Sequence, residues 1–198
     1  MQLYLIRHPR PNNVAGLCYG RQDVPVDTES VARAATVVRE RIPEPVLSAA
    51  VIFTSPSQRC MLLARELAAP REPCVALDLQ EMSFGAWEGR NWETVPRDQL
   101  DAWAADVWDY RPGGAESAAM VAQRWRRWST LMRRTMNAGV IAVTHAGVIR
   151  VALACAGILD TATFGESAIG FGSVHCVEVD VDVDVEVDVE VDVEGDEP

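Results

Sequence analysis

The sequence predicts an α/β protein, a three-layer α/β/α sandwich with a mostly parallel sheet. Short apolar runs at residues 3–6, 51–53 and 140–143 have the composition of strands that are buried on both faces. Between them lie segments in which apolar residues recur every three or four positions, as on one face of a helix. Strand and helix therefore alternate along the chain, which is typical of parallel strands joined by right-handed crossovers.

Five segments are predicted to be helices. Residues 29–42 carry an apolar stripe that ends at Pro43. The second helix is predicted to begin with Ser55 as its N-cap and Pro56 at its first position, and to carry Arg59 in its first turn. The other three are predicted over residues 100–108, 121–132 and 147–156.

The chain of 198 residues is predicted to form one domain, residues 1–177, followed by an acidic tail, residues 178–198. Val alternates with Asp or Glu almost without a break over residues 174–193, and the start of this stretch, residues 174–179, is predicted to be an edge strand. Beyond it, closely spaced carboxylates on one face repel each other, so residues 182–198 are interpreted as a solvated or frayed extension. The alternative is that part of this segment lengthens the edge strand.

The net charge and the composition indicate which classes of binding partner are favoured. The net charge is −11, and 11 of the 29 acidic residues lie in the tail, so the predicted domain is formally neutral. Nucleic acid and membrane surfaces are therefore disfavoured as partners. The sequence lacks an apolar run of about 20 residues and a leader peptide, and its five cysteines form no C-x-x-C pair, which together predict a soluble, cytoplasmic protein. The oligomeric state is left open.

Every basic residue is Arg, because the sequence contains no Lys. A P-loop needs a Lys at the transferring phosphate, and Schiff-base chemistry needs a Lys amine, so both are excluded. A phosphate would have to be bound by Arg, whose guanidinium holds phosphate oxygens in a bidentate manner.

Each of the three predicted strands runs directly into residues that bind or attack phosphate. Arg7 and His8 follow the first, Arg59 follows the second in the first turn of a helix, and His145 follows the third. The carboxyl ends of parallel strands meet at one edge of a sheet, so these side chains are expected to converge. Taken alone, each His could be an ordinary strand-end residue that hydrogen-bonds to the backbone, and each Arg could be an ordinary solvated side chain. Their joint occurrence favours a phosphate site.

The chemistry available to His at a phosphate is nucleophilic attack, which gives a phosphohistidine that water later cleaves. The imidazole must be neutral, with one nitrogen free and the other tied to an acceptor. The leaving alkoxide also needs an acid. Glu81 could supply the proton if the adjacent phosphate charge keeps its carboxyl protonated; the ordinary interpretation is a carboxylate hydrogen-bonded within a turn.

These residues lie in motifs that resemble those of the histidine phosphatase superfamily, whose fold is called phosphoglycerate-mutase-like. The matching runs are LIRH at 5–8, YGRQD at 19–23, TSPSQR at 54–59, EMSFGAWEG at 81–89, GGAES at 113–117 and THAG at 144–147. The resemblance implies that His8 is the phosphorylated nucleophile and that Arg7, Arg59 and His145 bind the phosphate. It implies that Glu81 is the proton donor and later the base for water, and that no metal or other cofactor is needed.

Within the superfamily the sequence looks most similar to α-ribazole phosphatases of cobalamin synthesis, so the expected substrate is a small phosphate ester, α-ribazole 5′-phosphate. Tyr19 and Arg21 are expected to contact this substrate, while Trp87 and Trp92 either line its pocket or fill the core. Pro9 departs from the usual Gly and removes a backbone N–H. The alternatives are mutase-like phosphoryl transfer and a non-catalytic protein that binds a phospholigand.

Overall fold

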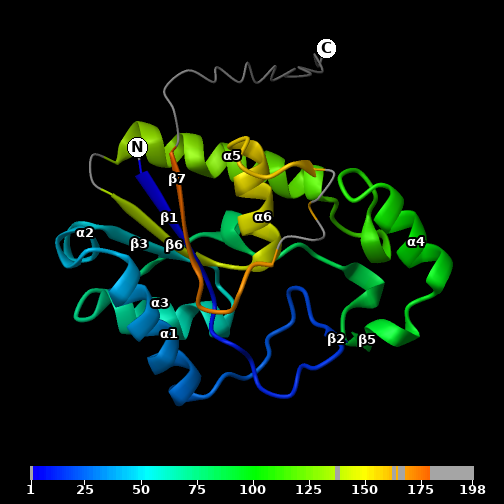
Figure 1. Cartoon of the computed structure of the whole chain (residues 1–198), viewed down its shortest axis with the longest axis horizontal. Coiled ribbons are helices and arrows are strands. Elements are labelled where there is room, and N and C mark those ends of the chain that lie inside the picture. The colour runs from blue at the N-terminus through cyan, green and yellow to red at the C-terminus, as the bar shows by residue number, and fades with distance from the viewer. Residues whose placement is uncertain (1, 137–138, 162–163, 165–167, 179–198) are drawn as a thin grey trace, which may run out of the picture.

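The computed structural model describes residues 2–136, 139–161, 164 and 168–178. A five-stranded sheet lies between two layers of helices (Figure 1). Its strands, in sheet order, are β4 (Cys74–Val75), β3 (Val51–Thr54), β6 (Val140–Thr144), β1 (Gln2–Arg7) and β7 (Val174–Glu178). All pairs are parallel except β1 with β7. The predicted three-layer fold with a mostly parallel sheet is confirmed.

Strand β6 lies at the centre of the sheet, and all five of its residues are buried. Its side chains alternate between two apolar layers. Val140 and Ala142 belong to one core cluster, and Ile141 and Val143 belong to the other. A strand that buries both faces must be apolar at every position, which explains why this run could be recognised from composition.

Helices cover both faces of the sheet. On one face lie α1 (Thr28–Arg41), α2 (Glu44–Ala49) and α3 (Gln58–Ala68), and on the other lie α5 (Ala118–Thr135) and α6 (Ala146–Cys155) (Figure 1). Four of the five predicted helices are close to their predicted bounds. None of the helices in the described part of the chain combines the length and the apolar character needed to span a membrane.

The predicted start of α3 is wrong. The helix begins at Gln58, two residues later than expected, and its N-cap is Ser57. Ser55 instead continues the sheet, because its backbone N–H donates to the Val143 carbonyl at 3.0 Å. The first helical N–H, that of Gln58, is capped from elsewhere in the chain by Asp23, whose Oδ1 accepts it at 2.9 Å.

The predicted helix over 100–108 is displaced by about one turn. The observed helix, α4 (Arg97–Ala105), begins directly after Pro96, which serves as its N-cap, and ends with Asp106 as its C-cap. Trp108 lies outside the helix and packs against the core beside α5 and α6. Its apolar character reflects this tertiary contact and not a continued helical face.

The predicted edge strand is confirmed as β7, which pairs antiparallel with β1. The rest of the predicted tail, residues 179–198, lies outside the described residues.

A smaller body beside α4 carries a two-stranded sheet, β2 (Leu17–Cys18) with β5 (Arg90–Asn91), which the sequence did not predict (Figure 1). The described part of the chain also contains four 3-10 turns, at Leu77–Leu79, Gly85–Trp87, Trp92–Thr94 and Pro112–Gly114. The core of the smaller body is aromatic: Trp87 packs against Trp92 and Trp103. The segment that carries Glu81 joins the 3-10 turn Leu77–Leu79 to this body, and its residues Leu79 and Met82 pack in the core of the main sheet.

Candidate active site

The residues that follow β1, β3 and β6 converge, as the sequence predicts. The ring centroids of His8 and His145 are 5.2 Å apart. Nη2 of Arg59 donates to Nδ1 of His145 at 3.2 Å. The sheet register produces this meeting, since Arg7 is paired with Thr144 and the residue after each of them extends the same edge. All three groups are buried, with at most 1 % of each residue exposed.

Backbone carbonyls of the segment after β2 hold the Arg59 guanidinium. Nη2 donates to the Gly20 carbonyl at 2.7 Å and Nη1 to the Gln22 carbonyl at 2.8 Å. The Nε–H of Arg59 is buried and meets no acceptor among the described residues, and the same holds for the Nε–H of Arg7. Buried donors without a partner are costly, so two such groups beside two histidines favour an anionic ligand that would accept from them.

Arg7 is fixed from the side of β7. Its Nη1 donates to the Ile169 carbonyl, and its guanidinium carbon lies 3.7 Å from the centroid of the Phe171 ring. The same ring lies 5.5 Å from the His8 ring and 4.8 Å from the guanidinium carbon of Arg10. Phe171 therefore forms a wall of the site that sequence reasoning missed, since nothing in its local sequence distinguishes it from an ordinary core aromatic.

The His8 ring has the expected tautomer. Nδ1 lies 2.7 Å from the Pro9 carbonyl oxygen, so Nδ1–H donates to that carbonyl and the lone pair is on Nε2. The carbonyl of Pro9 thus orients the ring, although Pro9 has no N–H to offer to a phosphate.

His145 is held at both nitrogens. Because Nδ1 accepts from Arg59, Nε2 carries the proton and donates to the Ser55 hydroxyl at 2.8 Å. This contact gives Ser55 a place in the site in addition to its place in the sheet. The thiol of Cys60 also lies close, with Sγ 3.5 Å from the same Nε2, and burial raises the pKa of this thiol, so it stays protonated.

Both imidazoles are neutral near pH 7. Burial lowers the pKa of His8 well below its ordinary value of 6.5, and the charge of Arg59 lowers it further. Burial also lowers the pKa of His145, followed by the effects of His8 and Arg59. A neutral His8 with a free lone pair on Nε2 is the form that can attack phosphorus.

These shifts predict how stability depends on pH. The unfolded chain binds a proton at each imidazole near pH 6.5, whereas the folded protein binds it only at lower pH. The free energy of unfolding is therefore expected to fall as the pH decreases below about 6.5, by up to about 1.4 kcal/mol per pH unit for each imidazole. Urea unfolding between about pH 7.5 and about pH 5 measures this slope. A His145→Asn variant should show a smaller slope, and an unchanged slope would contradict the assignment.

Glu81 follows the 3-10 turn Leu77–Leu79 and reaches the N-terminus of α6. Its Oε1 accepts from the Met82 N–H at 2.9 Å, and its Oε2 accepts from the Gly147 N–H at 3.3 Å. A Cβ at Gly147 would lie 2.4 Å from Oε1, so only glycine leaves room for the carboxylate here. Burial lowers the pKa of both Arg7 and Arg150, and the negative charge of Glu81 partly offsets this fall, so the carboxylate lies near both guanidinium groups.

Tyr19 and Arg21 differ in their surroundings. Tyr19 lies among the predicted phosphate residues: its ring is 5.2 Å from the Arg59 guanidinium carbon, and Arg7 and Arg59 partly offset the rise in its pKa caused by burial. Arg21 is engaged by the protein, because its Nη2 donates to Glu116 at 2.9 Å and its Nε donates to the Glu81 carbonyl at 2.9 Å. A substrate contact for either residue stays a prediction.

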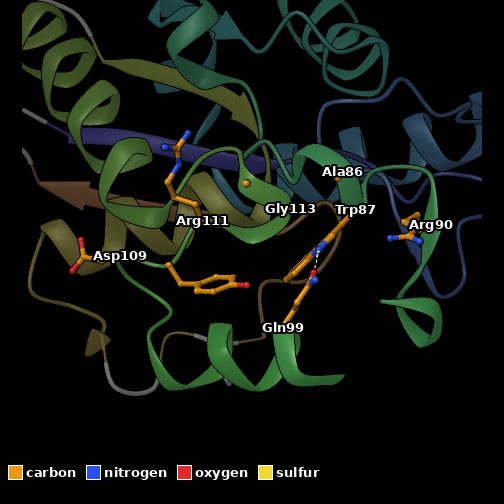
Figure 2. A pocket seen from close by; sticks show the side chains of 9 residues that line it. Ala86, Trp87, Arg90, Gln99, Asp109, Arg111 and Gly113 are labelled. Carbon is orange, nitrogen blue, oxygen red and sulfur yellow. Dashed lines mark hydrogen bonds between the residues drawn. The ribbon is translucent and has the colours of Figure 1, made fainter. Parts of the chain in front are cut away.

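A separate pocket of about 670 Å³ opens beside α4 (Figure 2). Trp87 and Gln99 meet across it through a hydrogen bond of 3.0 Å, and Arg90 and Arg111 also line it. Its lining includes none of the predicted phosphate residues. Trp87 is only 1 % exposed, so its main role is in the aromatic core, the second of the two interpretations above.

Comparisons with known proteins agree with this geometry. The family model of the histidine phosphatase superfamily (branch 1) matches residues 3–189, and the chain belongs to this superfamily. It is therefore an enzyme that acts on phosphate esters.

Individual relatives support the same class. The chain is 25 % identical over 162 residues to an adenosylcobalamin/alpha-ribazole phosphatase of Salmonella typhimurium, covering 78 % of each protein. The crystal structure of the alpha-ribazole phosphatase from Shigella flexneri is similar in fold, with a TM-score of 0.75, 24 % identity and 91 % of each chain covered. The crystal structure of a phosphoglycerate mutase from Thermus thermophilus is 28 % identical, with a TM-score of 0.68 and coverage of 90 % of this chain and 93 % of that one.

Proposed function

We propose that the protein is a phosphomonoesterase that hydrolyses a small phosphate ester through a phosphohistidine formed on His8. The observation that carries this proposal is the neutral, buried His8 ring 5.2 Å from His145, beside two arginines that each present an unpartnered buried N–H. These N–H groups would donate to the phosphate oxygens, with His145 held beside them by Arg59 and Ser55.

In the first step Nε2 of His8 attacks phosphorus, and the bond from phosphorus to the ester oxygen breaks. Glu81 gives its proton to that oxygen, so the product leaves as an alcohol. In the second step the Glu81 carboxylate takes a proton from water while the water oxygen attacks the phosphohistidine. The bond to Nε2 breaks and inorganic phosphate leaves, which returns His8 and Glu81 to their first states.

The substrate we propose is α-ribazole 5′-phosphate. The relative from Salmonella typhimurium supports this choice, as does the resemblance of residues 16–21, residues 84–89 and the short middle region to α-ribazole phosphatases. Mutase-like phosphoryl transfer is the second candidate, because a phosphoglycerate mutase is among the similar structures. Hydrolysis is favoured because only about 27 residues separate Gly89 from Glu116, which leaves little chain to shield the phosphoenzyme from water.

The test is the release of inorganic phosphate from a panel of α-ribazole phosphate, phosphosugars, phosphoserine, nucleotides and phosphoglycerates. We expect the highest kcat/KM for α-ribazole phosphate. Isomerised phosphoglycerate without free phosphate would show a mutase instead, and vanadate binding without turnover of any ester would show a binding protein. Because His8 is itself the nucleophile, the reaction needs no metal-bound water, and EDTA is expected to leave the rate unchanged.

A further inference from the structure

A buried ion cluster lies next to the segment that carries Glu81. It consists of Glu116, Arg124 and Arg21, and we refer to these three residues as the Glu116 clamp. Arg124 donates to Glu116 twice, from Nε to Oε1 at 2.9 Å and from Nη2 to Oε2 at 3.1 Å. Arg21 adds a donation from Nη2 to Oε2 at 2.9 Å. Glu116 is 9 % exposed and Arg124 is 8 % exposed, so the charges are largely removed from water.

The Glu116 clamp holds the segment 78–83 at three points. Arg124 donates from Nη1 to the Asp78 carbonyl, and Arg21 donates from Nε to the carbonyl of Glu81 itself. The third point is Ser83, whose N–H donates to Oε2 of Glu116 at 3.2 Å and whose carbonyl accepts from the Glu116 N–H at 3.1 Å. Glu81 therefore has clamp contacts on its own carbonyl and on both sides of it.

The segment depends on such contacts because it has little regular structure of its own. Residues 80–84 form neither helix nor strand, and one 3-10 turn, Leu77–Leu79, precedes them. The two clamped segments also touch through their backbones: at Gly113, where φ is 58°, a Cβ would lie 1.9 Å from the Phe84 carbonyl oxygen. This close approach fixes the segment of Glu81 against the segment of Glu116.

We propose that Glu116, acting with Arg124 and Arg21, is a positioning residue that sets where the Glu81 carboxyl meets the leaving-group oxygen. The proposal rests on the proposed function, since it assumes that Glu81 is the proton donor. None of the clamp contacts given above is to the Glu81 carboxyl. The clamp acts through the backbone, and a displacement of about 1 Å at a reacting group can lower a rate by about 100-fold.

A Glu116→Gln variant keeps the size of the side chain but removes the charge that two arginines share. We expect kcat for an alkyl phosphate such as α-ribazole phosphate to fall by about 10- to 100-fold. With p-nitrophenyl phosphate, whose leaving group needs little protonation, the rate of the initial burst of p-nitrophenol should fall far less. The matched control is Glu66→Gln, which breaks the exposed pair between Glu66 and Arg39 and should leave both rates unchanged. Equal slowing of the p-nitrophenol burst and of alkyl phosphate turnover by Glu116→Gln would overturn the proposal.

A double-mutant cycle distinguishes this proposal from the proposed function. If Glu116 acts through Glu81, adding Glu116→Gln to Glu81→Gln should slow the alkyl phosphate little further, whereas independent effects would multiply and overturn the proposal. If Glu81→Gln discriminates between the two esters and Glu116→Gln does not, only the role of Glu116 is lost. If Glu81→Gln slows the p-nitrophenol burst as much as alkyl phosphate turnover, the acid role of Glu81 falls and the positioning role falls with it.

Arg21→Lys provides a second route if Glu116→Gln does not fold, because Arg21 is only half-buried. A Lys ammonium cannot reproduce the planar fork that donates to both Glu116 and the Glu81 carbonyl. We expect the same pattern, a lower kcat for the alkyl phosphate with a nearly unchanged p-nitrophenol burst. A rise in KM with an unchanged kcat would mark Arg21 as a substrate contact only and would contradict its place in the clamp.

Discussion

The His8→Ala variant is expected to lose turnover of every phosphate ester that the wild-type protein hydrolyses. Removal of a catalytic nucleophile typically lowers kcat by about 10⁴-fold or more. Here no neighbour can replace it, because both nitrogens of His145 already hold hydrogen bonds, to Arg59 and to Ser55. The measurement is the release of inorganic phosphate under saturating substrate.

A substrate that carries a label in its phosphoryl group tests directly whether a phosphohistidine forms on His8. Rapid quenching of the wild-type protein into alkaline denaturant, in which an N-linked phosphoryl group is stable, should trap label on His8, and the His8→Ala variant should trap none. His175→Ala is the matched control, because His175 lies on β7 and contacts Ser173, with Nε2 2.8 Å from its hydroxyl. Label retained by His8→Ala, or turnover close to that of the wild-type protein, would contradict nucleophilic catalysis by His8.

The main architecture could be predicted because its signals are local. Strands β1, β3 and β6 are apolar along their length, since both faces are covered by helices. The strands of two residues, β2, β4 and β5, leave no such pattern. The start of α3 was misplaced because Ser followed by Pro is a good helix start in isolation. The hydrogen bond between Ser55 and Val143 across the sheet overrides that local preference.

The convergence of the predicted phosphate residues could be predicted because each ends or directly follows a strand, or lies in the first helical turn after one, so that the sheet itself brings them together. The groups that orient these side chains could not be predicted from the sequence. Arg59 is held by the carbonyls of Gly20 and Gln22, and any residue type has a carbonyl to offer. Phe171 and Glu116 depend on loops that close over long sequence separations. Their roles follow from tertiary structure alone.

Replacing Glu81 by Gln is expected to have the second large effect. General acid catalysis contributes about 10²- to 10⁴-fold in rate, or about 3 to 5 kcal/mol of barrier. The amide keeps the shape of the side chain, and its oxygen can still accept from the Met82 or Gly147 N–H, but it carries no acidic proton. For an alkyl phosphate, kcat should therefore fall by about 10²- to 10⁴-fold.

The expected loss depends on the leaving group, and this dependence separates acid catalysis from damage to the site. A p-nitrophenolate leaves without a proton, so formation of the phosphohistidine from p-nitrophenyl phosphate should proceed at nearly the wild-type rate in Glu81→Gln. Its breakdown should be slow, because Glu81 is also the proposed base for water, so a burst of p-nitrophenol followed by a slow steady state is the expected time course. Stopped-flow absorbance measures both phases. Equal slowing of the burst and of alkyl phosphate hydrolysis would show that Glu81 shapes the pocket and transfers no proton.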